Sequence, residues 1–144
     1  MASIRLMRLE DYEPVYALWS RIDGMGLRSL DDSREGISRY LQRNPSTCFV
    51  AVEADAVIGV ILAGHDGRRG FLYHLAVAEN HRGQGIGSAL LAKAVTALEA
   101  EGIHKASLVV KANNELGNTF WQAKGWTDRP DLVYRNQSFN DENQ

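Results

Sequence analysis

Three glycines alternate with other residues in the stretch HRGQGIGSALL, which spans residues 81–91. An apolar run precedes this stretch and a helical pattern follows it, which predicts a loop that leads from a strand into a helix. The first N–H groups of a helix have no partner within it and lie at the positive end of its dipole. Bare glycine backbone lets a phosphate approach them, and Arg82 adds a positive charge. The stretch therefore predicts a pyrophosphate-binding loop; a tight turn with close helix packing is the alternative.

Two common nucleotide-binding motifs do not fit this stretch. A P-loop requires GxxxxGK[ST], whereas Ser88 and Ala89 follow Gly87 here, without a lysine. The dinucleotide fingerprint GxGxxG also differs from the GxGxG spacing found here. That fingerprint further requires an acidic residue at the end of the next strand, and SLVVKANN offers none. These mismatches disfavour a nucleotide-binding regulatory domain.

The remaining chain alternates short strands with helices. Apolar residues at helical spacing predict helices over residues 10–22, 29–44, 86–102 and 114–125. Apolar runs predict strands over 3–9, 47–65 with a turn at Ala54–Asp55, 71–77, 105–110 and 132–135, with 71–77 at the centre of the sheet. The middle strands should form an antiparallel meander, and the unit after the glycines a parallel crossover. We expect an α/β (α+β) domain with a mixed, mostly antiparallel sheet of about six to seven strands flanked by about four helices.

The composition is that of an ordinary globular domain. The length of 144 residues suits one core, and we assign residues 1–137 to a single domain and 138–144 to a polar, frayed tail. A net charge of -2 without charge blocks disfavours nucleic-acid and membrane-surface binding. A single cysteine and four scattered histidines predict no metal site. The chain has neither an apolar run of about 18 residues nor a secretory leader pattern, so a cytoplasmic location is expected.

Two segments resemble the motifs of one enzyme family. LAVAENHRGQGIGSALL resembles motif A of the GNAT N-acetyltransferases, [QR]xxGx[GA], and NNELGNTFWQAKGW resembles the motif that follows it. The matching residues are Arg82, Gly85 and Gly87 in the first motif and Asn114, Gly125 and Trp126 in the second. The resemblance covers almost the whole chain and implies the GNAT fold. It also implies an acetyl-CoA-dependent N-acetyltransferase that acts on a primary amine of a small molecule, a peptide N-terminus or a lysine, by direct attack in a ternary complex.

The resemblance implies a position for acetyl-CoA. The cofactor would lie in a V-shaped gap between strands 71–77 and 105–110. The main chain of Leu75, Ala76 and Val77 would run beside the pantetheine arm, and the Val77 N–H would stabilise the oxyanion. The other cofactor-binding residues implied are Arg82, Gly83, Gln84, Gly85, Ile86, Gly87, Ser88, Asn114, Asn118 and Trp121. Asn114 is equally suited to cap the helix that follows it, and the two roles are compatible.

The residues for proton transfer depart from the family pattern. Many members have a tyrosine as general acid where this chain has Trp121, and an indole N–H is not a practical proton source. We therefore name Tyr73 and Tyr134 as catalytic candidates. Strand alternation predicts that Tyr73 shares a face with Val77 and that His74 points to the opposite face. Burial as ordinary core residues is the alternative for Tyr73 and His74.

The acceptor amine should bind to the first two helices, the loop between them and the last strands. The candidate acceptor contacts are Trp19, Asp23, Met25, Leu27 and Arg28. Asp23 has the charge to pair with a cationic amine, although a solvated turn acid is the alternative. A homodimer through the last strands is compatible with the resemblance. Trp121 also keeps a second class open, a coenzyme A-binding regulatory or partner protein with weak or no catalysis.

Overall fold

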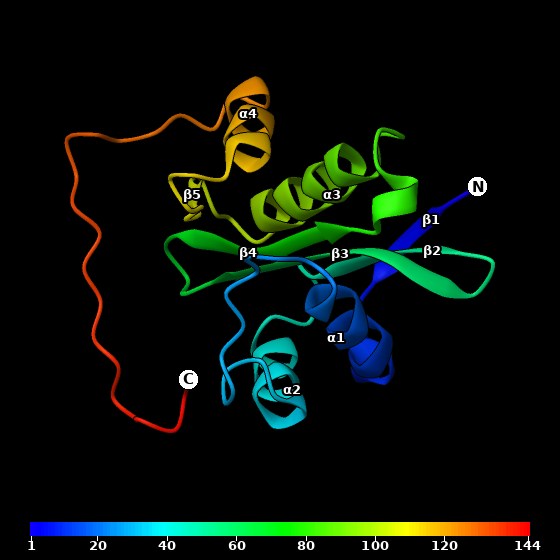
Figure 1. The fold of residues 1–144 in the computed structure, drawn as a ribbon. Coiled ribbons are helices and arrows are strands. Elements are labelled where there is room, and N and C mark those ends of the chain that lie inside the picture. The colour runs from blue at the N-terminus through cyan, green and yellow to red at the C-terminus, as the bar shows by residue number, and fades with distance from the viewer.

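The computed structural model describes residues 1–144 as a sheet with helices on both faces (Figure 1). The strands are β1 (Ser3–Leu6), β2 (Phe49–Glu53), β3 (Ala56–His65), β4 (Gly70–Val77) and β5 (Ala106–Ser107). The α-helices are α1 (Tyr12–Ser20), α2 (Arg34–Arg43), α3 (Ile86–Ala100) and α4 (Glu115–Ala123). Two short 3-10 helices, η1 (Leu9–Asp11) and η2 (Glu79–His81), precede α1 and the glycine stretch.

The order of the strands in the sheet follows their order in the chain, β1-β2-β3-β4-β5. The first three pairs are antiparallel and β4 pairs with β5 in parallel, which confirms the meander and the crossover. The prediction that residues 71–77 form the central strand is wrong, because β3 is central. β4 is fully paired on one side only, since its contact with β5 is limited to Gly70 and Phe71.

The sheet has five strands, fewer than the six or seven predicted. The strand expected over 105–110 is reduced to Ala106–Ser107. No strand forms over 132–135, where Leu132 and Tyr134 are 60% and 66% exposed. A two-residue edge strand offers too few free backbone groups to pair with another strand, so this segment runs apart from the sheet at the outside of the molecule (Figure 1).

Two hydrophobic layers hold the helices to the sheet. α1 and α2 cover one face and α3 covers the other (Figure 1). The α1/α2 layer contains Val15, Trp19, Ile37, Leu41, Val60 and Leu62, and the α3 layer contains Ile61, Leu72, Leu90, Leu91, Ala94 and Leu98. At Gly59 the α3 helix comes so close that an added Cβ would lie 3.0 Å from Leu90 Cδ1.

The helix ends follow local signals. α2 begins at Arg34, later than predicted, because the Ser33 hydroxyl accepts a hydrogen bond from the Gly36 N–H at 3.0 Å and so caps the helix. α3 ends before Gly102, whose φ of +84° is left-handed, as expected of a glycine C-cap.

The sequence predicts a frayed C-terminal tail, but its last residue is held in place, because the Ser29 N–H donates a hydrogen bond to the Gln144 carbonyl at 2.8 Å. No helix of the structure is both long and apolar enough to cross a membrane.

An ion pair between a buried carboxylate and a partly exposed arginine fixes the start of α1 to the first strand. Asp11 is 6% exposed, and its two carboxylate oxygens each accept a hydrogen bond of 2.8 Å from the Arg5 guanidinium. The Arg8 N–H donates to the same carboxylate at 2.8 Å. Burial raises the pKa of Asp11, but these hydrogen bonds and the charge of Arg5 outweigh it and lower the pKa below the usual 3.8. The folded state therefore favours the ionised carboxylate.

Asp11→Asn is expected to lower the free energy of unfolding by about 1–3 kcal/mol at neutral pH, because Arg5 loses its charged acceptor. Since the folded-state pKa of Asp11 is lowered, its contribution is present above the unfolded-state pKa of about 3.9 and is lost as pH falls through the folded-state value. Denaturant unfolding of both proteins from neutral pH down to about pH 2 tests this. A difference in unfolding free energy that stays constant over that range contradicts the assignment.

Candidate functional site

β4 and β5 separate directly after their two paired positions. Gly70 pairs with Ala106 and Phe71 with Ser107, and no pairing follows. Further along β4 the Ala78 N–H donates to the Ile58 carbonyl at 2.8 Å. Because hydrogen-bonded positions alternate along an antiparallel pair, the N–H and C=O of Val77 point away from β3, toward the open edge. The main chain of Val77 therefore lines the side of β4 that β5 has left.

The glycine stretch forms a loop of unpartnered amides at the start of α3. Gly83 and Gly85 have left-handed φ values of +78° and +80°, and Gly85 caps α3 without a side-chain hydrogen bond. The backbone N–H groups at the start of this helix belong to Gly85, Ile86, Gly87 and Ser88. None of these four groups donates a hydrogen bond within the protein. The first turn contains no acidic residue. Unpartnered amides at the positive end of a helix suit an anionic group.

The residues before the glycines anchor the loop on two sides. The Arg82 Nε donates to the Val77 carbonyl at 3.2 Å, and no carboxylate pairs with the guanidinium. His81 Nε2 lies 2.9 Å from Glu53 Oε2. This hydrogen bond is the main reason why the pKa of Glu53 is lowered. Arg82 is thereby held between the edge of β4 and the unpartnered amides, with its terminal nitrogens free for an anion.

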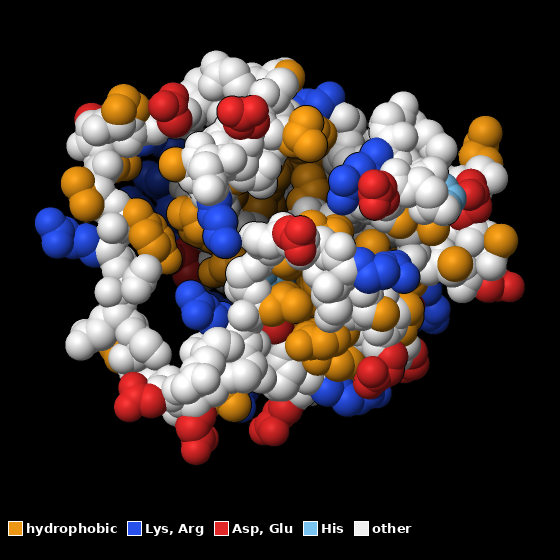
Figure 2. Space-filling view, in the orientation of Figure 1, with side chains coloured by type: hydrophobic (Ala, Val, Ile, Leu, Met, Phe, Trp, Pro, Cys, Tyr) orange, Lys and Arg blue, Asp and Glu red, His pale blue; other side chains and the backbone are white.

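The second motif places α4 against the start of α3. A Cβ added to Gly87 would lie 3.6 Å from the Phe120 ring, so the two helices meet at the glycine stretch. Trp121 packs between Phe120 and Trp126, with ring centroids 5.1 and 5.5 Å away. In the space-filling view the surface is hollowed beneath α4, and hydrophobic side chains form the floor of this hollow (Figure 2).

Two asparagines of the second motif hold the start of α4. The Asn114 side chain accepts a hydrogen bond from the Gly117 N–H at 2.9 Å, so the expected capping role is confirmed. Asn118 Nδ2 donates to the Lys111 carbonyl at 3.1 Å and to the Asn114 carbonyl at 2.8 Å. Both asparagines therefore stabilise the turn between β5 and α4.

A bulge in β4 changes which side chains share a face. Leu62 lies opposite Tyr73 and Val60 opposite Ala76, so two residues of β4 face one of β3. His74, inside the bulge, has a left-handed φ of +51°. Beyond it, Val77 packs in the α3 layer, whereas Tyr73 packs on the other face, with its ring centroid 6.0 Å from that of Tyr40 in α2. The prediction that Tyr73 shares a face with Val77 is therefore wrong, because the bulge breaks the alternation on which it relied.

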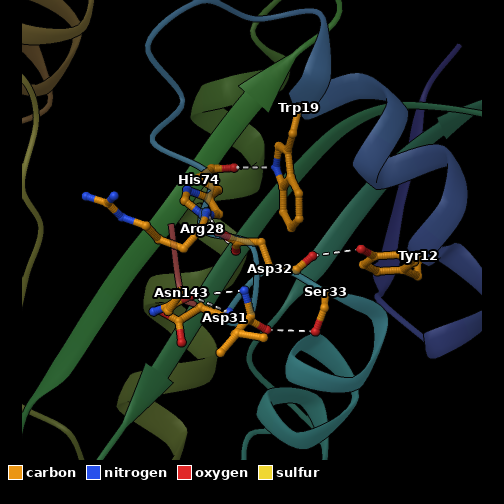
Figure 3. Close-up of polar contacts among 9 residues, drawn as sticks. Tyr12, Trp19, Arg28, Asp31, Asp32, Ser33, His74 and Asn143 are labelled. Atoms are coloured by element: carbon orange, nitrogen blue, oxygen red, sulfur yellow. Dashed lines mark hydrogen bonds and ion pairs between the residues drawn. The ribbon is translucent and has the colours of Figure 1, made fainter. Parts of the chain in front are cut away.

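The bulge also brings His74 to the α1/α2 face, where it meets a buried carboxylate (Figure 3). His74 Nε2 lies 2.9 Å from Asp32 Oδ1, and Asp32 is 5% exposed. The other carboxylate oxygen accepts the Arg28 N–H at 2.7 Å, and the Tyr12 hydroxyl donates to the Asp32 carbonyl at 2.7 Å. The Trp19 indole N–H donates to the His74 carbonyl at 3.2 Å. No group of three or more His, Cys, Asp or Glu side chains suited to a metal ion gathers in the structure.

The Asp32–His74 pair is the feature that sequence reasoning missed. The two residues are 42 positions apart and neither belongs to a motif. Strand alternation predicted that His74 points away from Tyr73, whereas their ring centroids lie 6.2 Å apart on one face. Only the bulge and the loop before α2 bring these side chains together.

The acceptor candidates lie in and around the segment between α1 and α2. Trp19 is fully buried, and its indole N–H donates a hydrogen bond to the His74 carbonyl. Trp19 therefore supports the backbone of His74. Met25 and Leu27 pack partly buried against the α1/α2 layer. Asp23 and Arg28 are exposed, and the Arg28 side chain extends away from the Asp32–His74 pair (Figure 3).

The two candidate tyrosines differ in their surroundings. Tyr73 is 44% exposed and lines a cleft with Tyr40, Phe71 and Arg69. Burial is the main cause of its raised pKa, and the charges of nearby Tyr134 and of Asp31 add to it. Tyr73 therefore stays protonated at neutral pH. Tyr134 lies in the C-terminal segment and is 66% exposed.

Comparisons with known proteins identify a family and a fold for this chain. A model described as the acetyltransferase (GNAT) family matches residues 10–126. An acetyltransferase of Sodalis glossinidius is 39% identical over 112 residues, 78% of each chain. The structure of Ard1 from Thermoplasma volcanium superposes with a TM-score of 0.76 at 22% identity, covering 86% of this chain and 81% of that chain. A predicted acetyltransferase from Clostridium acetobutylicum, solved with acetyl-CoA, gives a TM-score of 0.72 at 20% identity over 94% and 96% of the two chains.

Asn114→Ala is expected to lower the free energy of unfolding by about 1 kcal/mol, because the Gly117 N–H loses its capping acceptor. Asn113→Ala is the matched control, since Asn113 is exposed and makes no side-chain hydrogen bond. Denaturant unfolding of both variants measures the difference. Equal stabilities of the two variants contradict the capping role.

Proposed function

The chain belongs to the GNAT acetyltransferase family, and we propose that it transfers the acetyl group of acetyl-CoA to a primary amine. The observation that carries this proposal is that an open strand edge and a group of unpartnered amides lie close together in the chain, at β4 and at the start of α3. The strand has an open edge at Val77, and after η2 the chain presents the unpartnered amides of Gly85 to Ser88 at the start of α3. An extended ligand arm that ends in a pyrophosphate matches both features.

The proposed cofactor position follows from these donors. The pyrophosphate binds the amides at the start of α3 and the free nitrogens of Arg82. The pantetheine arm lies along the open edge of β4, beside Leu75, Ala76 and Val77. Asn114, Asn118 and Trp121 contact the cofactor from α4, alongside their roles in holding that helix. The acetyl-CoA bound to the Clostridium acetobutylicum protein of the same fold supports this choice of cofactor.

The proposed reaction is direct attack of the amine on the thioester carbonyl. The amine nitrogen forms a bond to the carbonyl carbon, and the outward Val77 N–H stabilises the oxyanion. The C–S bond then breaks, and the thiolate takes a proton from the protonated Tyr73 hydroxyl. The proton released by the nitrogen returns to Tyr73 through solvent. The acceptor binds near Asp23, Met25, Leu27 and Arg28, on the α1/α2 side, with Tyr134 at the rim.

A second candidate function is coenzyme A binding without efficient catalysis. Trp121 favours it, because its indole occupies the position of the usual family acid and packs between two aromatic rings. Turnover separates the two functions, since both require the cofactor. Release of free thiol from acetyl-CoA in the presence of lysine, peptide N-terminal and small primary amines supports the enzyme. Acetyl-CoA binding without turnover with every amine supports the second candidate.

Gly85→Ala is expected to raise the KM for acetyl-CoA about 10-fold, equivalent to about 1.4 kcal/mol of binding, because alanine disfavours the left-handed backbone that orients the amides. Gly102→Ala is the matched control. It lies at the other end of α3 with a φ of +84°, and like Gly85 it has no atom within 4 Å of an added Cβ. The two variants carry a similar backbone penalty. An equal KM for acetyl-CoA in both variants contradicts the phosphate-binding role.

Tyr73→Phe is expected to lower kcat by about 100-fold, because the leaving thiolate loses its proton donor. Tyr16→Phe, on the exposed side of α1, is the control that removes a tyrosine hydroxyl elsewhere. Steady-state kinetics with acetyl-CoA and the fastest amine of the panel measure the effect. A kcat within twofold of wild type in folded Tyr73→Phe restricts Tyr73 to packing.

A further inference from the structure

We propose that His74 is the base that removes a proton from the acceptor amine, and that Asp32 is the positioning residue that orients its ring. The inference rests on the proposed N-acetyl transfer and adds to it the group that activates the nucleophile. An alkyl ammonium with a pKa of about 10 must lose a proton before it attacks.

The backbone of His74 has a strained, left-handed conformation that contacts with surrounding residues must stabilise. Three non-glycine residues have positive φ values, and two of them, Ala54 and Asp55, form the turn between β2 and β3. His74, at +51°, is the one inside a strand. Such strain persists where surrounding contacts enforce it, often at functional sites. Here the Trp19 indole holds the His74 carbonyl, and the Trp19 and His74 ring centroids lie 5.0 Å apart.

The Asp32 carboxylate fixes which nitrogen of His74 is free. One oxygen accepts the Arg28 N–H and the other faces His74 Nε2 at 2.9 Å, with no Lys or Arg side chain paired to it. A buried carboxylate requires donors, so the neutral imidazole carries its proton on Nε2. Nδ1 then has a free lone pair, and it makes no hydrogen bond in the structure. The His74 side chain is 14% exposed, so the ring is reachable but largely shielded from bulk water.

The chain contains two further histidine–carboxylate pairs, and the carboxylate of each is more exposed than that of Asp32. His65 pairs with Glu101, whose side chain is 44% exposed, and His81 pairs with Glu53, which is 32% exposed. The Asp32 side chain is 7% exposed. In both of these pairs the second ring nitrogen also has a partner, because the Gly67 N–H donates to His65 Nδ1 at 2.9 Å and His81 Nδ1 lies 3.0 Å from Asn80 Oδ1. Only the Asp32 pair combines a shielded carboxylate with a second ring nitrogen that has no partner.

The position of His74 on β4 suits proton removal from an incoming amine. His74 lies three residues before Val77, whose amide faces the open edge proposed for the thioester. The ring lies on the opposite, α1/α2 face, beside the segment proposed for the acceptor (Figure 3). The amine therefore approaches from the side of the base, while the oxyanion forms on the side of the cofactor.

The proton transfers balance with the group transfer. His74 Nδ1 takes one proton from the ammonium, directly or through one water, and the neutral nitrogen attacks the carbonyl carbon. The C–N bond forms, the C–S bond breaks, and Tyr73 protonates the sulfur. The nitrogen loses its second proton, which restores Tyr73, and His74 releases its proton to solvent. The products are the N-acetylated amine, free coenzyme A and one proton.

His74→Asn tests the base directly. Asparagine tolerates a left-handed backbone, so the bulge is preserved. We expect kcat to fall about 100-fold or more with the fastest amine of the panel, while the Kd for acetyl-CoA stays within twofold. The groups facing the ring are Asp32 and Tyr73, and both remain in the variant. The exposed His104 supplies the matched control, His104→Asn, which should behave as wild type.

Asp32→Asn tests the positioning role. The amide still accepts the Arg28 N–H, but its NH₂ group faces His74 Nε2 and forces the imidazole proton onto Nδ1. We expect nitrogen-detected NMR of the imidazole to show the Nε2–H form in wild type and the Nδ1–H form in the variant. The kcat should fall about 10-fold or more. Glu101→Gln makes the same chemical change at the exposed His65 pair and should leave both the His74 tautomer and kcat unchanged.

The outcomes separate this inference from the proposed function. Wild-type turnover with a kcat within twofold in folded His74→Asn overturns the base role and leaves N-acetyl transfer standing. An Nδ1–H tautomer of His74 in wild type overturns the role of Asp32, whatever the activity. Acetyl-CoA binding without turnover by wild type with every amine overturns the proposed function, and the base role with it.

Discussion

The left-handed backbone of His74 is the constraint on which the rest of the site depends. A regular β4 would place Tyr73 in the α3 layer and would send His74 and Tyr73 to opposite faces. The bulge instead turns both side chains toward α1 and α2 and returns Val77 to the α3 layer. β4 also loses its pairing with β5 just before this point. One local irregularity thus separates the face proposed for the acceptor from an open edge within the same strand.

Packing keeps that irregularity in place. Trp19 is completely buried in the α1/α2 layer, and its indole N–H takes up the His74 carbonyl that the bulge removes from the ladder. Asp32 holds the ring, while Ser33, the next residue, caps α2. The segment between α1 and α2 therefore contains two adjacent residues with different roles: Asp32 holds the His74 ring, and Ser33 caps α2. Changes in this segment should affect stability and activity together.

The sequence predicts local features of this protein well. The glycine loop, the α3 helix with its Gly102 end, the hairpin at Ala54–Asp55 and the Asn114 cap all depend on neighbouring residues, and each is present. The site beyond the loop depends on residues far apart in the chain. Period-two alternation assumes a regular strand. It therefore predicts the wrong face for Tyr73 relative to Val77 and for His74 relative to Tyr73. No motif marked Asp32, because its role exists only when the loop before α2 packs against β4.

The failed strand predictions have a related cause. Residues 108–110 and 132–135 are apolar enough to pair, but pairing needs a free edge with matching backbone groups. β4 and β5 separate after Phe71 and Ser107, so β5 has only two residues and the C-terminal segment has no partner strand. The apolar pattern of these segments therefore predicts more sheet than the structure forms.

Calorimetric titration of the purified protein with acetyl-CoA, coenzyme A, ATP and NAD tests the central claim most directly. The proposed binding mode predicts micromolar binding of acetyl-CoA and coenzyme A with no binding of ATP or NAD, because it places the pantetheine arm on the open edge of β4 in addition to the pyrophosphate at the start of α3. Absence of acetyl-CoA and coenzyme A binding would contradict it, and the glycine stretch would then serve only as the start of α3.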